Sequence, residues 1–509
     1  MRNQINKMWE KLENWMRNHI KLFRRIGIAL FVLVGITGLS IVGFYFYVQH
    51  TCPKEIVLED AFYDIAALDL SFSERDLRRD YDTDGAKYLA ASADGVQTEG
   101  EGVTYADGVI TVSAPGTYIF SGETEGMLLV DAGAEDKVQL VFRQFSLSNS
   151  QGPALYIRSA DKVFLTTAEN TVNTLSDGAQ YAYTDGDTNV DGAVFSKADL
   201  TLNGSGTLKI SGKAAHGIVS KDNLVVGSGT YEITSAKKAL NGKDCVKIHD
   251  CQMALQAGTD GICSDNTEAA DRGFVYIQGG NIRITCQNDG VQAENVLLLE
   301  APVMELLSGG GSVNAPQKES DKAKGRKERE TEPEEITTES MKGLKSAKDI
   351  LINGGEYTID SCDDSIHADH SVKIVDGTFQ IKSGDDGVHG EHTLQILGGK
   401  LTIQNSFEGL EAYQIAISGG EISVTASDDG INAASDSTAI SGLKGLFAIQ
   451  ALGKLEITGG HLTVDSQGDS LDSNGVMTLS GGTILVSGPA GGGAGDGIVD
   501  CDGSKTVNG

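Results

Sequence analysis

The sequence has little proline, few aromatic residues and a shortage of positive charge. Its 509 residues contain 7 Pro against 64 Gly, and aromatic side chains account for 6 %. This balance argues against a large globular core rich in aromatics and favours short strands joined by tight turns. The formal net charge of −30 argues against binding to a nucleic-acid backbone, which requires a positive surface, and favours cations or cation-bridged polymers. The alternative is that the carboxylates only keep an extracellular protein soluble.

Cysteine is also scarce, so a disulfide framework is not expected. The 7 cysteines are odd in number and fit no C-x-x-C spacing. Cys245 and Cys251 could pair across a turn, but we favour single thiols buried as small hydrophobic side chains.

One long apolar run lies near the N-terminus. Residues 26–48 carry no charge, and as a helix they would span a hydrocarbon core of about 30 Å. Residues 1–25 are basic, so the positive-inside rule places them in the cytoplasm and the rest of the chain outside the cell. Because the run is too long for a signal-peptide core and lacks a small-x-small cleavage site, we predict an uncleaved signal anchor in a single-pass cell-membrane protein.

A repeat of about 22 residues is clearest after Lys345. Four copies of an Asp-Asp-Gly-like turn follow one another, each with an aliphatic residue shortly after the acidic residues. These copies are Asp363–Ala368, Asp385–Gly390, Phe407–Ala412 and Asp428–Ala433. Further copies begin at Gly468 and Gly495, at wider spacing because loops intervene.

Each copy contains three short strands, which predicts a three-sided parallel coil. In one copy, the pairs that point the same way are Ile366 with Ala368, Val372 with Ile374, and Phe379 with Ile381. Glycine pairs precede the third strand, where the chain must turn a corner. Equivalent strands would stack in parallel, about 4.8 Å apart. An earlier half follows the same plan less strictly, with turn residues at Gly192, Gly217, Ala239, Gly261 and Gly290.

The repeat also sets the expected domain boundaries. We expect residues 49–104 to form an extracellular stalk or cap, and residues 105–307 and 346–509 to form two parts of one solenoid. Residues 308–345 are rich in Lys, Glu, Ser, Thr and Gly and have few apolar side chains to bury. We therefore expect a disordered, charged insertion there.

These features resemble those of a known family. The segment Asp191–Leu200, the pair Gly261-Ile262 and the acidic turns with their glycine pairs resemble the bacterial cell-surface carbohydrate-binding domain family, whose members resemble pectate lyases in fold. The resemblance implies an all-β, right-handed parallel β-helix that binds calcium and cellulose or acidic plant polysaccharide, without established catalysis. Two departures stand out. Lys237-Lys238-Ala239 replaces an acidic turn, which argues against a cation site on that rung, and the chain stops soon after Asp500, where further strands would be expected.

Stacking would place the turn carboxylates in a ladder with steps of about 5 Å, where neighbouring charges repel by about 1 kcal/mol even in water. Ca²⁺ would offset this repulsion because it accepts roughly six to eight oxygen ligands in flexible geometry. The alternative is that each Asp caps its own turn by accepting backbone N–H bonds. The predicted metal ligands are Asp363, Asp364, Asp385, Asp386, Glu408, Asp428 and Asp429.

A polar stripe is expected at the outward position after the turn aliphatic of each copy. It comprises Gln292, His367, His389, Glu411, Asn432 and Asp472. A rigid row of hydrogen-bonding side chains that repeats every ~5 Å suits an extended polysaccharide. We predict that the members after Gln292 contact carbohydrate and that Tyr413 stacks on a sugar ring, although a lone exposed tyrosine is more often incidental.

Two histidine motifs lie on adjacent copies. His367-Ala-Asp369-His370 and His389-Gly-Glu391-His392 would bring four imidazoles and two carboxylates together, which could bind zinc or a similar ion. The alternative, which we favour, is two outward histidines per rung at a solvated corner.

Three functions are open at this point. We expect a cell-surface protein that holds plant cell-wall or other acidic polysaccharide with the help of Ca²⁺; its partners would be a cellulose-like or pectin-like polymer and the membrane. The second is a calcium-dependent lyase or hydrolase. A lyase needs a strong base, usually Arg or Lys, and no arginine occurs between Ile350 and Gly509, so we expect no enzymatic activity. The third is a structural adhesin that does not bind sugar.

Overall fold

The computed structural model describes residues 7–9, 11, 62–98, 100–186, 188–316, 318, 339–434, 453–489 and 497–508. The chain divides into two compact units, residues 1–59 and residues 60–509. In the first unit the described residues, 7–9 and 11, are helical. The predicted signal anchor at 26–48 lies outside the described residues, and no described helix is both long and apolar enough to cross a membrane.

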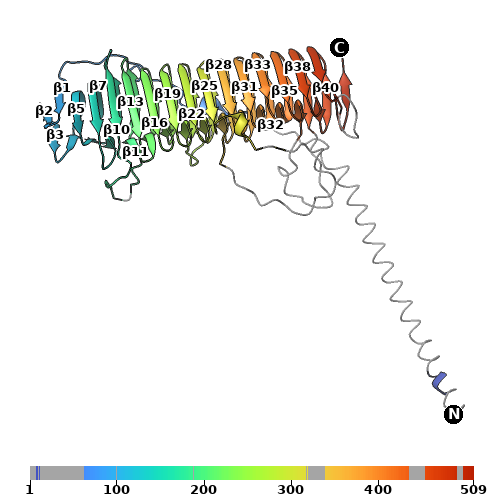
Figure 1. Ribbon diagram of the computed structural model, residues 1–509, viewed down its shortest axis with the longest axis horizontal. Coiled ribbons are helices and arrows are strands. Elements are labelled where there is room, and N and C mark those ends of the chain that lie inside the picture. The colour runs from blue at the N-terminus through green and yellow to red at the C-terminus, as the bar shows by residue number, and fades with distance from the viewer. Residues whose placement is uncertain are drawn as a thin grey trace. The chain divides into compact units, whose positions relative to one another are not determined.

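The second unit is an all-β parallel coil (Figure 1), as the repeat predicts. Each turn of the coil contributes one strand to each of three parallel sheets, and equivalent strands of successive turns pair in register, as Ile366 with Val388, Ser371 with Thr393, and Thr378 with Lys400 show. The two halves form one solenoid, because strand pairing continues across the charged insertion from Val291 to Leu344.

The first sheet carries the acidic turns at its entrance. It contains β4 (Val109–Val112), β6 (Met127–Asp131), β8 (Leu155–Ser159), β11 (Gly192–Ser196), β14 (His216–Ser220), β17 (Leu240–Gly242), β20 (Ile262–Ser264), β23 (Val291–Ala293), β26 (Leu344–Ser346), β29 (Ile366–Ala368), the first halves of β32 (Val388–Ile396) and β34 (Leu410–Ile417), β36 (Ile431–Ala433) and β39 (Asp472–Ser473).

The second sheet follows the first around a corner of each turn. It contains β1 (Lys87–Ser92), the first parts of β5 (Gly116–Glu125) and β7 (Lys137–Ser148), β9 (Lys162–Thr167), β12 (Asp199–Gly204), β15 (Asn223–Val226), β18 (Cys245–Ile248), β21 (Phe274–Ile277), β24 (Val296–Leu299), β27 (Asp349–Ile352), β30 (Ser371–Ile374), the second halves of β32 and β34, β37 (Lys454–Ile457), β40 (Val476–Leu479) and β42 (Lys505–Val507).

The third sheet completes the triangle. It contains the last parts of β5 and β7, β10 (Val172–Ser176), β13 (Thr207–Gly212), β16 (Thr230–Ser235), β19 (Gln252–Ala257), β22 (Asn281–Cys286), β25 (Val303–Ser308), β28 (Glu356–Ser361), β31 (Thr378–Ser383), β33 (Lys400–Asn405), β35 (Glu421–Ala426), β38 (His461–Ser466) and β41 (Thr483–Ser487). Outside the three sheets lie the antiparallel strands β2 (Gly95–Thr98) and β3 (Val103–Ala106) and the 3₁₀ turns η1 (Ile65–Ala67) and η2 (Ser312–Asn314).

The core is a continuous stack of inward side chains. Strand alternation turns every second residue inward, so Ile366, Val388, Leu410 and Ile431 lie one above another, each fully buried. Before the third sheet, the second glycine of each pair has a positive φ, for example +85° at Gly399, which most side chains would resist. Cys245, Cys251, Cys263, Cys286 and Cys362 are unpaired and buried, as the sequence predicts.

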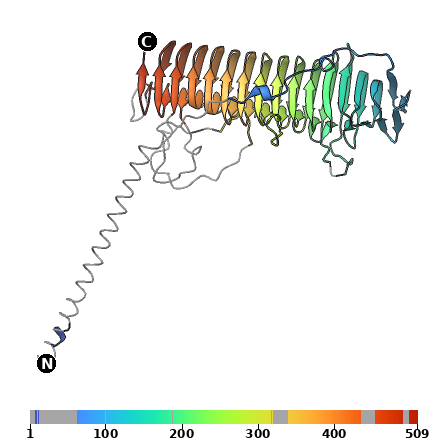
Figure 2. The ribbon, with the colours of Figure 1, turned by 180° about the vertical axis from the view of Figure 1, so that it is seen from behind.

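Residues 62–76, placed by the sequence in a stalk or cap, run along the outside of the second sheet; we call them the strap (Figure 2). The backbone N–H of Tyr63 donates to Asp349 Oδ2 at 2.5 Å, and Lys247 Nζ donates to the carbonyl of Ser71 at 2.8 Å. Asp76 accepts from Thr201 Oγ1 at 2.6 Å. Since later strap residues contact earlier rungs, the strap crosses the rungs and covers apolar side chains on the outer surface of the second sheet.

Candidate metal and carbohydrate site

The turns before the first sheet bring one residue of each rung into a single column, which we call the ladder. The backbone N–H of the turn residue on one rung donates to the carbonyl of the ladder residue on the next, for example Gly387 to Glu408 at 3.0 Å and Gly409 to Asp429 at 3.0 Å. Linked in this way, the ladder runs through Lys238, Asp260, Asp289, Lys342, Asp364, Asp386, Glu408, Asp429 and Asp469.

Several ladder carboxylates cap the turn of the next rung, whereas the alternative to metal binding had each Asp capping its own turn. Asp364 Oδ1 accepts from the N–H of Asp386 at 3.0 Å, and Asp429 Oδ1 accepts from the N–H of Asp469 at 2.6 Å. Asp289 Oδ1 caps Lys342 in the same way at 2.9 Å. Turn capping thus uses one oxygen of each of these carboxylates, and Oδ2 of Asp364 faces basic side chains instead.

Lysine supplies the counter-charge in the first part of the ladder. Lys342 Nζ lies 2.6 Å from Asp364 Oδ2 and 3.0 Å from Asp363 Oδ2, and its side chain is 13 % exposed. Burial alone would lower the pKa of Lys342, but the two carboxylates raise it above its ordinary value, so the ammonium stays charged. Lys345 lies 3.4 Å from Asp289 in the same way. The sequence pattern did not predict either lysine here, because both fall in the segment 308–345 that was expected to be a disordered insertion.

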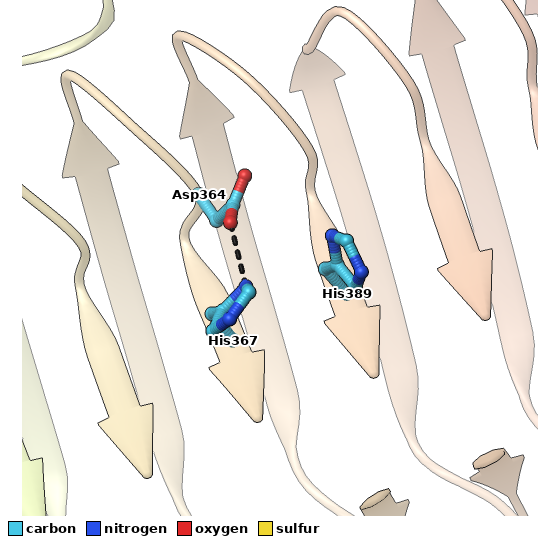
Figure 3. A group of neighbouring side chains, drawn as sticks. All are labelled: Asp364, His367 and His389. Carbon is cyan, nitrogen blue, oxygen red and sulfur yellow. Dashed lines mark ion pairs between the residues drawn. The ribbon is translucent and has the colours of Figure 1, made fainter. Parts of the chain in front are cut away.

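On the next two rungs, histidine side chains lie beside the ladder carboxylates in place of lysine (Figure 3). His367 Nδ1 lies 2.7 Å from Asp364 Oδ2, and His389 Nδ1 lies 3.0 Å from Asp386 Oδ2 and 3.3 Å from Glu411 Oε2. Burial would lower the pKa of His367, but the carboxylates of Asp364 and Asp369 outweigh it and raise the pKa to about 9. The pKa of Asp364, which burial alone would raise, is held well below its usual range by His367 and Lys342.

The later rungs carry ladder and stripe carboxylates that have no lysine or arginine partner among the described residues. No lysine or arginine among the described residues pairs with Glu408, Glu411, Asp429 or Asp472. Burial, together with the charges of Asp386 and Asp429, raises the pKa of Glu408 to about 9. Burial and the neighbouring Glu408 raise the pKa of Glu411 to about 11.

Two further carboxyl groups on the later rungs, those of Asp429 and Asp472, also have raised pKa values. Burial raises the pKa of Asp429 to about 7, opposed by the hydrogen bond from the backbone of Asp469 and reinforced by the charge of Asp428. Burial and the charges of Asp469 and Asp500 raise the pKa of Asp472 to about 6. The folded chain therefore needs protons or cations here.

Asn432 points to a cation rather than to protons alone. Its side chain is 8 % exposed, and its Nδ2 donates to Glu408 Oε2 at 2.9 Å. Its Oδ1 is buried and, within the described part of the chain, has no hydrogen-bond partner. A buried oxygen without a donor, beside carboxylates without counter-ions, has the chemistry of an oxygen-ligand metal site.

The outer residues of the acidic doublets differ among rungs. Asp363 pairs with Lys342, and Asp385 pairs with Lys318. Burial and the charges of Asp386 and Asp364 still raise the pKa of Asp385 to about 7. The carbonyl of Asp428 accepts from the N–H of Gly468 at 2.8 Å. Of the seven predicted ligands, Asp363, Asp364 and Asp385 thus have cationic partners within the protein.

The ladder ends in a cluster of three carboxylates that was not among the metal ligands predicted from the sequence. One oxygen each of Asp469, Asp472 and Asp500 lies within 4.8 Å of the others. Asp469 belongs to the copy that begins at Gly468, so the repeat itself was the available signal; widened spacing hid the equivalence.

The polar stripe forms as the repeat predicts, with one addition. Register aligns Gln292, Lys345, His367, His389, Glu411, Asn432 and Asp472 in one column of the first sheet. Lys345 was not predicted there. Towards the N-terminus the same column continues through Cys263 and Asn241 and then becomes apolar, with Val219, Phe195 and Tyr156. The polar stripe is thus confined to the later rungs, and its contact with carbohydrate stays a prediction.

Tyr413 is buried, with 7 % of its surface exposed, whereas the sequence analysis placed it in solvent beside the stripe. The cause is a shortened corner. Gly390 pairs with Ala412 and Thr393 with Gln414, so Tyr413 alone occupies the corner that Glu391 and His392 fill on the previous rung.

The two histidine motifs form separate pairs. The ring centroids of His367 and His389 are 4.8 Å apart, and those of His370 and His392 are also 4.8 Å apart. His370 Nδ1 lies 2.6 Å from Asp349 Oδ1, on the strand that holds the strap. Among the described residues, a possible metal-binding group with two histidines contains only the His367 and His389 pair, so the four imidazoles do not form the single cluster that was the less favoured possibility.

Comparison with known proteins places this site in a family. A family of carbohydrate-binding domain-containing proteins matches residues 106–387 and 385–497, more than half of the chain. A carbohydrate-binding domain-containing protein of Acetivibrio thermocellus is 29 % identical over 215 residues, which are 42 % of this chain and 75 % of that protein. A solved structure described as the polysaccharide lyase-like protein from C. thermocellum, gadolinium derivative, is 28 % identical, with a TM-score of 0.43 over 44 % of this chain and 92 % of that one.

The family match spans both parts of the solenoid and includes the ladder from Lys238 to Asp469 and the stripe from Gln292 to Asp472. It agrees with the family that the acidic turns and glycine pairs predict from the sequence. The chain belongs to the family of carbohydrate-binding domain-containing proteins.

Proposed function

We propose that the protein binds an acidic, pectin-like polysaccharide along the polar stripe, with Ca²⁺ held by the later part of the ladder. One observation carries the proposal: Glu408 and Asp429 lack basic partners in the described chain, and the buried Oδ1 of Asn432 beside Glu408 lacks a hydrogen-bond donor. Family membership supports a carbohydrate partner.

The donor set fits calcium. Carboxylate and amide oxygens from successive rungs are its preferred ligands, and the coil offers them at a regular rise. Glu408, Glu411, Asp429, Asn432 and Asp472 would hold the ions. Bound calcium would supply positive charge for the carboxylates of a uronate polymer, and the stripe would supply hydrogen bonds to its hydroxyls.

The earlier rungs have lysine side chains that neutralise their carboxylates. Asp363, Asp364 and Asp385 have Lys342 and Lys318 as partners, so we assign calcium to the carboxylates from Glu408 onward. Asp386 Oδ2 pairs with His389. Its rung lies between the earlier rungs, whose carboxylates have lysine partners, and the later rungs, to which we assign calcium.

We also propose that the protein does not cleave its ligand. A lyase needs an unprotonated base beside the bound uronate. Burial opposes the charged form of Lys342, but Asp364 and Asp363 outweigh it and raise its pKa, and Lys318 is paired with Asp385. These lysines beside the ladder are therefore held as ammonium ions and suit charge neutralisation better than proton abstraction.

The proposed location is the outer face of the cell membrane. It rests on the uncharged run at 26–48 and the basic residues before it. Protease treatment of intact cells tests it: loss of the solenoid with a protected N-terminal fragment supports the location, and a fully protected chain contradicts it.

Retention of the purified chain on insoluble polygalacturonate and on cellulose, with calcium or with EGTA, tests the binding function. We expect retention on polygalacturonate that EGTA abolishes, without unsaturated or reducing-end products over time. Accumulating products would favour the lyase or hydrolase. Absence of retention on both polymers would favour the adhesin and contradict the proposal.

A further inference from the structure

We propose that Asp364, His367 and His389 form a binding site for a divalent transition-metal ion of the zinc class, distinct from the calcium ladder that begins at Glu408. One ligand atom from each of the three side chains lies within 4.8 Å of the others. Figure 3 shows the two imidazoles on neighbouring rungs, with Asp364 on the same side as His367.

The inner nitrogen of His367 is not satisfied by the protein. His367 is 9 % exposed and Asp364 is 3 % exposed. Nδ1 lies 2.7 Å from Asp364 Oδ2, yet it makes no aligned hydrogen bond to any described residue. The two atoms form an ion pair, and because no aligned hydrogen bond holds them, both can turn to an ion as ligands.

The outer nitrogens are already oriented. His367 Nε2 lies 3.0 Å from Asp369 Oδ1, and His389 Nε2 lies 3.7 Å from Glu391 Oε1. In metal sites the nitrogen that does not bind the ion usually pairs with a carboxylate, which fixes the ring and its tautomer. His367 therefore has the outer partner that a metal-binding imidazole requires, and Glu391 lies close enough to His389 to serve as a charged neighbour.

The donor types separate this site from the calcium ladder. Imidazole nitrogen suits zinc and its first-row neighbours, whereas calcium prefers oxygen alone. With three protein ligands, the ion would keep a coordination position open. Asp386 and Glu411 lie 3.0 Å and 3.3 Å from Nδ1 of His389 and form a second possible group with it, so Asp386, which is not among the proposed calcium ligands, could complete the shell.

Lys342 is the competing cation at this site, and it has another partner. Its Nζ lies 2.6 Å from Asp364 and 3.0 Å from Asp363, so it can remain paired with Asp363 when an ion binds Asp364.

Equilibrium dialysis of the full chain against Zn²⁺ in excess Ca²⁺, with the bound metal measured by mass spectrometry, tests the proposal. We expect one tightly held zinc per chain, and an affinity at least roughly 100-fold lower in His367→Gln and in His389→Gln. His392→Gln removes an imidazole of the neighbouring pair, whose ring centroids are equally close at 4.8 Å, and is the matched control. Its zinc affinity should not change.

Cobalt substitution gives a readout that does not depend on any variant folding. Co²⁺ bound by two imidazoles and a carboxylate in a four-coordinate site should show strong visible absorption, whereas an all-oxygen six-coordinate site should stay pale. Absence of zinc binding, a pale cobalt form, or equal loss of zinc in His392→Gln would overturn the proposal. Glu408→Gln should leave zinc affinity unchanged, so failure here and failure of the calcium proposal are distinguishable.

Discussion

Lys342 and Asp364 form a buried ion pair, with Nζ 2.6 Å from Oδ2 and side chains 13 % and 4 % exposed. The pair lies where the ladder changes from lysine to histidine as its source of positive charge. The solenoid thus carries its own counter-ions on the earlier rungs, whereas Glu408 and Asp429 have no basic partner among the described residues.

Substitution of Lys342 by Met should therefore destabilise the fold. It leaves the buried Asp364 with His367 as its only basic partner in the described chain, and loss of one member of a buried pair costs about 3–5 kcal/mol. Chemical denaturation measures the free energy of unfolding. The control Lys400→Met breaks an exposed pair with Glu421 and should cost less than about 1 kcal/mol. A similar loss of unfolding free energy in both variants would show that the buried pair contributes no more to stability than the exposed one.

The metal-free chain should lose stability as the pH rises. The pKa of Asp429 is raised to about 7 and that of Glu408 to about 9, so the folded chain holds protons that the unfolded chain releases near the ordinary carboxyl pKa. Stability then falls as the pH rises above the unfolded value and through these folded values, by roughly 1–3 kcal/mol between about pH 6 and pH 9.

Thermal melts in EGTA and in calcium check this pH dependence. We expect a falling melting temperature with pH in EGTA, and a flatter profile in calcium or in Glu408→Gln. A melting temperature that rises with pH in EGTA would contradict the raised pKa values.

Calcium binding should release protons at neutral pH. Glu408, with a pKa of about 9, must lose its proton before it can bind the ion. Calorimetric titrations in two buffers with different ionisation enthalpies report the number of protons released. Glu408→Gln should lower that number while Glu421→Gln, on the third sheet, should not. Calcium binding without proton release would place the ions away from Glu408.

Asp76 should hold the strap to the coil. Its side chain is 5 % exposed, lies 2.7 Å from Lys162 Nζ and accepts from Thr201 at 2.6 Å. Asp76→Asn removes the charge beside Lys162, so we expect local release of the strap at a cost of about 3 kcal/mol. Hydrogen exchange over residues 62–86 measures it. Asp69→Asn, at an exposed position with Lys247 3.8 Å away, is the control and should leave exchange unchanged.

The sequence pattern predicts the ladder but not the path of the strap. Acidic turns and alternating aliphatics such as Ile366 and Val388 recur at a fixed spacing, so local pattern alone predicts the coil, its three sides and the column of turns. The path of the strap depends on contacts such as Asp76 with Lys162 and Thr201, which lie far apart in the chain and leave no periodic signal.

Two features of the site were beyond local pattern for a similar reason. Lys342 enters the ladder from the end of the charged insertion, on a rung whose turn has Met341 and Lys342 in place of two acidic residues. Tyr413 is buried because its rung has one corner residue fewer, as the 21-residue step from Phe407 to Asp428 hints. Charge balance and corner length are properties of neighbouring rungs taken together.

Calcium-dependent retention on polygalacturonate is the most direct test of the central claim. A ladder variant with Glu408→Gln and Asp429→Asn keeps side chains of similar size but removes two charges, and a control with Glu421→Gln and Asp465→Asn removes two charges from the third sheet. As calcium is increased, we predict half-maximal retention at the same concentration for the wild type and the control. The ladder variant should need at least roughly tenfold more calcium. Equal calcium dependence in all three proteins would contradict a calcium-bridged polysaccharide site on the ladder.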